Sequence, residues 1–132
     1  MSIEIIAGVI EAGQSLSPVM DCRAGEIVRL TMPPDWTNAV LTFQMSSDGL
    51  FFNSVYDHEG HELKVVVIAG AAVIVPVDYL AAAAYLKFRS GTADTPVNQP
   101  AKRDFAIALR VPDAETPPAG DDAPTINIRL RR

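Results

Sequence analysis

The sequence is poor in cysteine: Cys22 is the only one among 132 residues. A single thiol cannot form a disulfide within the chain, so a hydrophobic core must hold the fold together, and this length is enough to build one. We expect Cys22 to be a buried, inert thiol, because free cysteine packs like a small hydrophobic residue. A bridge to another subunit is the alternative.

Long apolar runs and positive charge are also lacking. No stretch approaches the roughly 18 apolar residues that a spanning helix needs, and the first ten residues lack the cationic start of a signal peptide. The chain has 11 Lys and Arg against 16 Asp and Glu, a net charge of -5. Such a surface repels phosphate backbones and anionic lipids. We therefore predict a soluble protein, with neither nucleic acid binding nor membrane insertion.

Motifs of catalysis and cofactor binding are missing as well. There is no glycine-rich phosphate motif, residues 46–49 lack the flanking glycines of a nucleophile elbow, and the acidic residues form no distinctive glycosidase pair. His58 and His61 are three residues apart in one glycine-containing loop, which is not the zinc-enzyme spacing; the loop's acids are Asp57, Glu59 and Glu62. We predict a solvated hairpin loop there, and no catalytic residue, cofactor or metal.

Alternation of apolar and polar residues is the dominant pattern. It is clearest in residues 39–45, 105–111 and 125–131, and it predicts half-buried strands. Asp48-Gly49 predicts a tight hairpin turn between residues 39–45 and 50–56, because these residue types accept positive φ angles. Further strands are predicted at residues 3–10, 16–22, 27–32, 63–68, 72–77 and 85–89.

Helical periodicity is nearly absent. Residues 78–84, with Asp78 as a cap, predict one short helical turn. Eight to ten short strands without long helices predict an all-β fold, an antiparallel β-sandwich with jelly-roll-like connections. Leu41, Phe43 and Trp36 are expected in its core.

The composition divides the chain into a sandwich domain at residues 1–111, a linker at 112–124 and a C-terminal strand with a basic end at 125–132. The linker has four prolines and four acidic residues without a large apolar side chain, which predicts an extended segment. In the last segment Ile126, Ile128 and Leu130 alternate with polar residues, so they must pack somewhere. Two partners stay open: the domain's own sheet, or the sheet edge of a neighbouring subunit.

A second candidate surface lies on the strand at residues 85–89. Tyr85, Lys87 and Arg89 share the face opposite Leu86 and Phe88, which predicts an outward or intersubunit stripe. The stripe and the three apolar residues of the C-terminal strand are the candidate interface or ligand residues.

Two blocks, residues 36–62 and 85–99, resemble small structural proteins of tailed bacteriophages, prophages and gene-transfer-agent-like particles. The first carries the run 36–49 followed by Phe52, Val55, Tyr56, Asp57, Gly60 and Glu62; the second carries 85–92 and 96–99. The resemblance implies a decoration, spike or fibre subunit of the head, neck or tail. Such a chain is assembled in the host cytoplasm into the virion, with other virion proteins and copies of itself as partners.

Carbohydrate binding is the alternative function, with a host surface glycan as ligand. Some β-sandwich modules stack sugars on exposed aromatic rings. The rings available for this are Trp36, Tyr56, Tyr79 and Tyr85.

Overall fold

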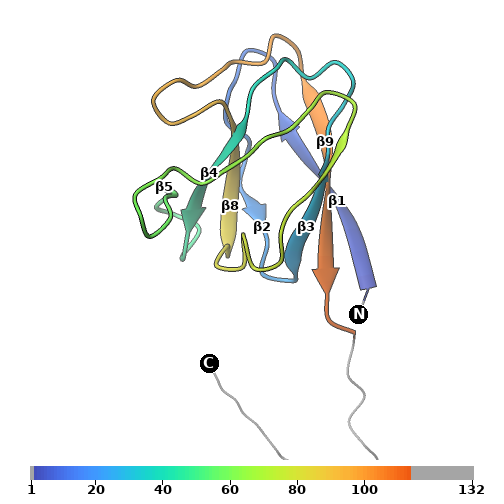
Figure 1. The fold of residues 1–132 in the computed structure, drawn as a ribbon, viewed down its shortest axis with the longest axis vertical. Helices are drawn as coiled ribbons and strands as arrows, with labels where there is room; N and C mark the ends of the chain where they lie inside the picture. The colour runs from blue at the N-terminus through green and yellow to red at the C-terminus, as the bar shows by residue number, and fades with distance from the viewer. Residues whose placement is uncertain (1, 114–132) are drawn as a thin grey trace, which may run out of the picture.

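The computed structural model describes residues 2–113, which form two antiparallel sheets packed face to face (Figure 1). Sheet A has the order β1-β9-β3-β7, and sheet B has the order β2-β8-β4-β5 with β6 also paired to β4. The predicted all-β sandwich is therefore confirmed. Its strands are β1 (Ser2–Ile10), β2 (Met20–Asp21), β3 (Glu26–Thr31), β4 (Leu41–Ser46), β5 (Asn53–Ser54), β6 (Lys64–Val65), β7 (Ala72–Ile74), β8 (Tyr85–Ser90) and β9 (Arg103–Val111).

The chain passes repeatedly between the two sheets. β5 and β6 pair with opposite halves of β4, through Ser54 with Gln44 and Lys64 with Thr42, so together they act as one interrupted strand. The residues between them form a hairpin closed by a bridge from Tyr56 to Glu62. Counted in this way, each sheet has four strands, and their order is the jelly-roll connectivity that was predicted.

The core lies between the inner faces of the sheets and is centred on aromatic rings. The ring of Phe88 packs edge-to-face against Phe43 at 5.6 Å and against Phe105 at 5.3 Å, and Trp36 packs against Phe105 at 6.4 Å. Such contacts add specific geometry to the burial of large apolar area. Leu41, Phe43 and Trp36 are all buried, as predicted.

Cys22 also lies in this core, as predicted, and is 2% exposed. Burial, with a smaller contribution from the negative charge of Asp21, raises the pKa of the Cys22 thiol to about 11. Because the thiolate is the reactive form, this thiol is inert at neutral pH.

The hairpin between β4 and β5 is confirmed, but its turn is longer than predicted. Gly49 has a φ of 81°, whereas Asp48 has no positive φ, so the two residues do not form a tight two-residue turn. Instead the carboxylate of Asp48 accepts hydrogen bonds from the backbone N–H groups of Leu50 and Phe51. These bonds hold a wider loop and lower the pKa of Asp48.

The predicted helical turn at residues 78–84 is wrong. This segment forms successive tight turns, with backbone bonds from Tyr79 to Pro76, from Ala81 to Asp78 and from Ala83 to Leu80. Asp78 has a φ of 67°, which is left-handed and incompatible with its predicted role as a helix cap. No helix long and apolar enough to cross a membrane occurs among residues 2–113.

β9 ends at Val111, beside the start of β1, since Val111 is in register with Ser2. The predicted strand at 125–131, with Ile126, Ile128 and Leu130, lies outside the described residues. Most of the predicted linker at 112–124 does so too.

Candidate functional site

The predicted stripe on β8 is divided into residues with different surroundings. Tyr85 and Lys87 are half-buried on the outer face of sheet B. The guanidinium of Arg23 lies 4.8 Å from the centre of the Tyr85 ring, and the ammonium of Lys87 lies 4.5 Å from the centre of the Phe52 ring. Each residue is thus partly covered by a cation–π neighbour from its own chain.

Arg89 differs from the prediction, because it is only 6% exposed. Its Nη1 donates to Glu62 Oε2 at 3.1 Å and to Thr42 Oγ1 at 3.2 Å, and its Nη2 donates to Ser54 Oγ at 3.0 Å. Glu62 in turn accepts the backbone N–H of Ala93. Arg89 does lie on the outer face of sheet B. It is not an outward residue, because the hairpin carrying Glu62 and the loop carrying Ala93 close over it.

The histidine loop is held mainly by backbone bonds to one carboxylate. Asp57 Oδ1 accepts the N–H groups of Glu59 and His61, and these bonds lower the pKa of Asp57. The His61 ring is 75% exposed, with Nδ1 at 3.6 Å from Asp57 Oδ2. Within residues 2–113, no three His, Cys, Asp or Glu side chains gather closely enough to hold a metal ion.

The four aromatic residues considered as sugar platforms lie in different surroundings. Trp36 is in the core, where its Nε1 donates to the carbonyl of Ala39. Tyr79 donates its hydroxyl to the carbonyl of Lys64, and Tyr85 lies against Arg23. Of the four, Tyr56 alone is more than half exposed.

The outer face of sheet A has a different character from that of sheet B. Ile3 and Ile5 are 53% and 54% exposed, and Ile74 is 73% exposed. The strand registers align Ile5 with Ala108, Arg29 and Ile74 across the sheet. The next row aligns Ala7 with Ala106, Thr31 and Ala72, so Arg29 and Thr31 of β3 lie between the apolar residues of β1 and those of β7. We define the sheet A patch as Ile3, Ile5, Ala7, Ala72, Ile74 and Ala106.

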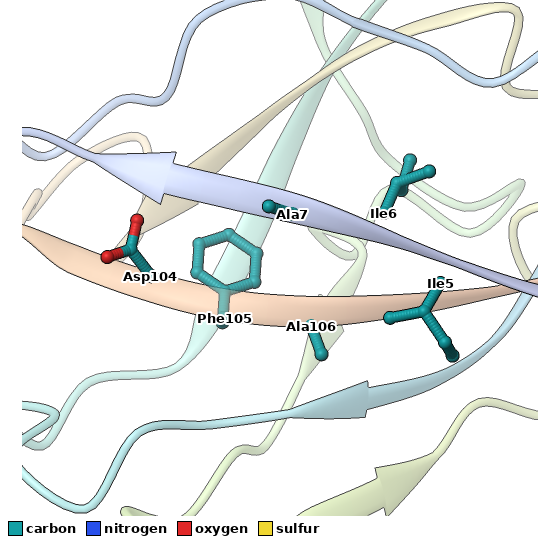
Figure 2. A pocket seen from close by; sticks show the side chains of 6 residues that line it. All are labelled: Ile5, Ile6, Ala7, Asp104, Phe105 and Ala106. Carbon is teal, nitrogen blue, oxygen red and sulfur yellow. The ribbon is translucent and has the colours of Figure 1, made fainter.

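A hollow of about 400 Å³ lies over β1 and β9 and shares Ile5, Ala7 and Ala106 with this patch. Its lining residues are drawn in Figure 2. The hollow is mainly apolar, and Asp104 is the one charged residue in its lining. Gly8 in β1 leaves room for the Phe105 ring of β9, because a Cβ on Gly8 would lie 2.4 Å from that ring. The lining residues are Ile5, Ile6, Ala7, Asp104, Phe105 and Ala106.

Within residues 2–113, β1 also forms a free edge of sheet A. It is nine residues long and pairs with β9 on one side. Among the described residues, no hydrogen bond reaches its other side. The remaining edge strands, β2, β5, β6 and β7, have two or three residues each. Unpaired backbone groups along a strand are a template for another chain.

The sequence predicted the strand of β1 but not that one of its apolar faces is exposed. The signal was a failure of alternation: Ile3 and Ile5 are apolar on one face, while Ile6 and Ile10 are apolar on the other. A strand that is apolar on both faces is typical of a sheet buried on both sides. Here one of those faces is open to solvent.

These surfaces are described from the structure of this chain alone. Comparisons with protein-family models, curated proteins and solved structures gave no match to this chain. Function therefore has to be argued from the chain's own residues.

Proposed function

We propose that this chain is a non-enzymatic structural subunit of a tailed-phage-type particle, acting through protein–protein assembly. The observation that carries the proposal is the sheet A patch together with the free edge of β1. Large apolar side chains exposed together on one face mark interaction surfaces, and long apolar edge strands promote association. Ile3 and Ile5 combine both features in one strand.

The polar residues give assembly further support. Arg89 is the most buried of the candidate residues for catalysis or ligand contact. Its guanidinium donates hydrogen bonds to Glu62, Thr42 and Ser54 of the same chain. The hollow over β1 and β9 offers one carboxylate, Asp104, in an apolar lining. An apolar surface with few polar groups suits a protein partner better than a small polar substrate.

The particle assignment rests on the resemblance of residues 36–62 and 85–99 to phage structural proteins, and the fold agrees with it, because jelly rolls recur in viral capsid proteins. The partners would be other virion proteins and further copies of this chain. Jelly rolls also occur in lectins. For carbohydrate binding, the aromatic side chains that are more than half exposed among residues 2–113 are Tyr56 and Phe51.

The test is incorporation into particles. Particles isolated from cells that express the full chain are reconstructed by electron microscopy, and the sandwich is fitted to the density. We expect the chain in the particle with sheet A against a neighbour. Ile74→Asp should reduce incorporation, whereas the matched control Ile68→Asp, at a similarly exposed position outside the patch, should not.

Two outcomes would overturn the proposal. One is a wild-type chain that stays a monomer and is absent from purified particles. The other is binding of the isolated chain to a glycan array that is lost on Tyr56→Ala, without any incorporation into particles.

A further inference from the structure

We propose that residues 125–131 of one copy bind as an added strand along the free edge of β1 in a neighbouring copy. This inference rests on the proposed function, because it names the partner of the surface on which that function depends. It identifies both the acceptor, β1, and the donor, the C-terminal segment.

The acceptor is chosen by length. A donor of seven residues needs a comparable run of unpaired backbone, and β1 supplies nine residues, about 30 Å of edge. In an antiparallel pair, the N–H and C=O groups of alternate residues point away from the partner. On β1 these outward groups have no hydrogen-bond partner among residues 2–113. The other edge strands of that part of the chain are too short.

The side chains of donor and acceptor match on the outer face of sheet A, and the other face offers one carboxylate. Placed beside β1, the alternating residues Ile126, Ile128 and Leu130 would extend the sheet A patch next to Ile3 and Ile5. The opposite face of the donor then carries its two arginines. On that face β1 presents Glu4, which is exposed and has no ion-pair partner among the described residues. The donor arginines are Arg129 and Arg131.

The linker is longer than pairing with the chain's own edge requires, so it can also reach a neighbouring copy. β9 ends at Val111 beside Ser2, so reaching the free side of β1 in the same chain means crossing about two strand spacings, roughly 10 Å. Loops of about 2 to 6 residues make most such connections. Residues 112–124 could span up to about 43 Å when fully extended. Their four prolines favour an extended chain, so this linker suits a span between subunits.

The first experiment measures the mass of the full chain in solution across a range of concentrations, by sedimentation equilibrium. We expect a concentration-dependent oligomer. Ile128→Asp in the donor and Ile5→Asp in the acceptor should each weaken association by about 100-fold or more, because each places a charge in an apolar contact. The matched controls are Gly120→Asp in the linker and Ile68→Asp, at an exposed position outside the sheet A patch; both should associate like the wild type. Circular dichroism verifies that each variant is folded.

The second experiment mixes the two defective variants. Ile128→Asp keeps a good acceptor, and Ile5→Asp keeps a good donor, so exchange between copies predicts a heterodimer in the mixture. Pairing within one chain predicts that both variants stay monomeric when mixed, which would overturn the inference.

A further result separates the two proposals. If the wild type oligomerises and neither variant weakens association, the strand-exchange inference is wrong while assembly stands. If the wild type is a monomer and is also absent from particles, both proposals fail.

Discussion

The outer faces of the two sheets meet solvent in opposite ways. On sheet B, the side chains that leave the core are polar or aromatic and find partners within the chain: Arg89 with Glu62, Lys87 with Phe52, and Tyr85 with Arg23. On sheet A, the corresponding positions of β1 and β7 carry isoleucines that are more than half exposed, Ile3, Ile5 and Ile74. The central strands of sheet A do carry one ion pair within the chain, between Arg110 and Glu26, but the isoleucines of β1 and β7 stay exposed.

This difference shows where to look for a partner. Polar side chains are easy to single out as candidates in a sequence. In the structure, however, those on the outer face of sheet B mostly contact other residues of the same chain. Buried polar groups require partners, and Arg89 has three. Exposed apolar side chains need only a surface that covers them. On the outer face of sheet A, the described residues do not provide such a surface. The exposed outer face of sheet A is therefore the better candidate for an assembly surface.

The largest expected effect comes from the core that both sheets share. Phe43→Ala should cost about 3 to 5 kcal/mol of unfolding free energy, because Phe43 is fully buried and contacts Phe88. The measurement is urea unfolding. Phe51→Ala is the matched control, since Phe51 is 78% exposed and should change stability by less than about 0.5 kcal/mol. A loss below about 1 kcal/mol for Phe43→Ala would show that the sheets do not share this core.

The next prediction tests whether residues of the same chain cover the outer face of sheet B. Arg89→Met should cost about 3 kcal/mol, because it leaves the carboxylate of Glu62 without its ion-pair partner at a side-chain exposure of 17%. Adding Glu62→Gln should recover part of the loss, and a double-mutant cycle by urea unfolding measures the coupling. If Arg89 instead served an intersubunit contact, Arg89→Met would weaken association and leave monomer stability nearly unchanged.

Much of the fold could be predicted from alternation, because side chains of a strand point to opposite faces in turn. The strands containing Leu41, Phe43 and Phe105 were found in this way, and the described strands fall within or close to the predicted ranges. Strand lengths were overestimated at 16–22 and 72–77, where β2 and β7 have only two and three residues, and also in the segments at 50–56 and 63–68. There the hairpin between Tyr56 and Glu62 interrupts the pairing with β4.

The surfaces were harder to predict, because they depend on contacts between distant segments. Alternation correctly placed Arg89 on the outer face, but it could not show that Glu62, 27 residues earlier in the chain, covers it. Likewise the apolar pattern of β1 does not distinguish a covered central strand from an exposed edge strand. The failure at Asp78 is local. Capping propensity favoured a helix start, whereas the structure has a left-handed φ there.

A smaller effect would sharpen the description of sheet A. Ile5→Ser and Ile74→Ser should each change unfolding free energy by about 1 kcal/mol or less, because both side chains are already more than half exposed. Urea unfolding of the monomer at low concentration provides the measurement. Ile107→Ser, at a fully buried position of the same sheet, is the contrasting control and should cost several-fold more. Equal losses at all three positions would mean that the outer face is covered.

The smallest effect concerns the hairpin on the sheet B side that carries both histidines. Replacing His58 and His61 together by Ala should change stability by less than about 0.5 kcal/mol, as surface substitutions do. The His61 ring is 75% exposed, and the loop is held by the Asp57 carboxylate, which accepts backbone N–H groups. Thermal unfolding at pH 7 with and without zinc measures this. Stoichiometric zinc in the purified protein, lost on His58→Ala, would contradict it.

The pH dependence of unfolding distinguishes the Asp57 carboxylate from the imidazoles. Backbone hydrogen bonds lower the pKa of Asp57 below its ordinary 3.8 in the folded state. The folded state therefore binds the proton less tightly than the unfolded chain, so the carboxylate's contribution is complete above pH 3.8 and is lost as the pH falls through the lower folded value. Asp57→Asn should weaken the fall in stability below pH 4, whereas the double histidine variant should largely keep it. An unchanged acid profile for Asp57→Asn would mean that these backbone bonds do not hold the hairpin.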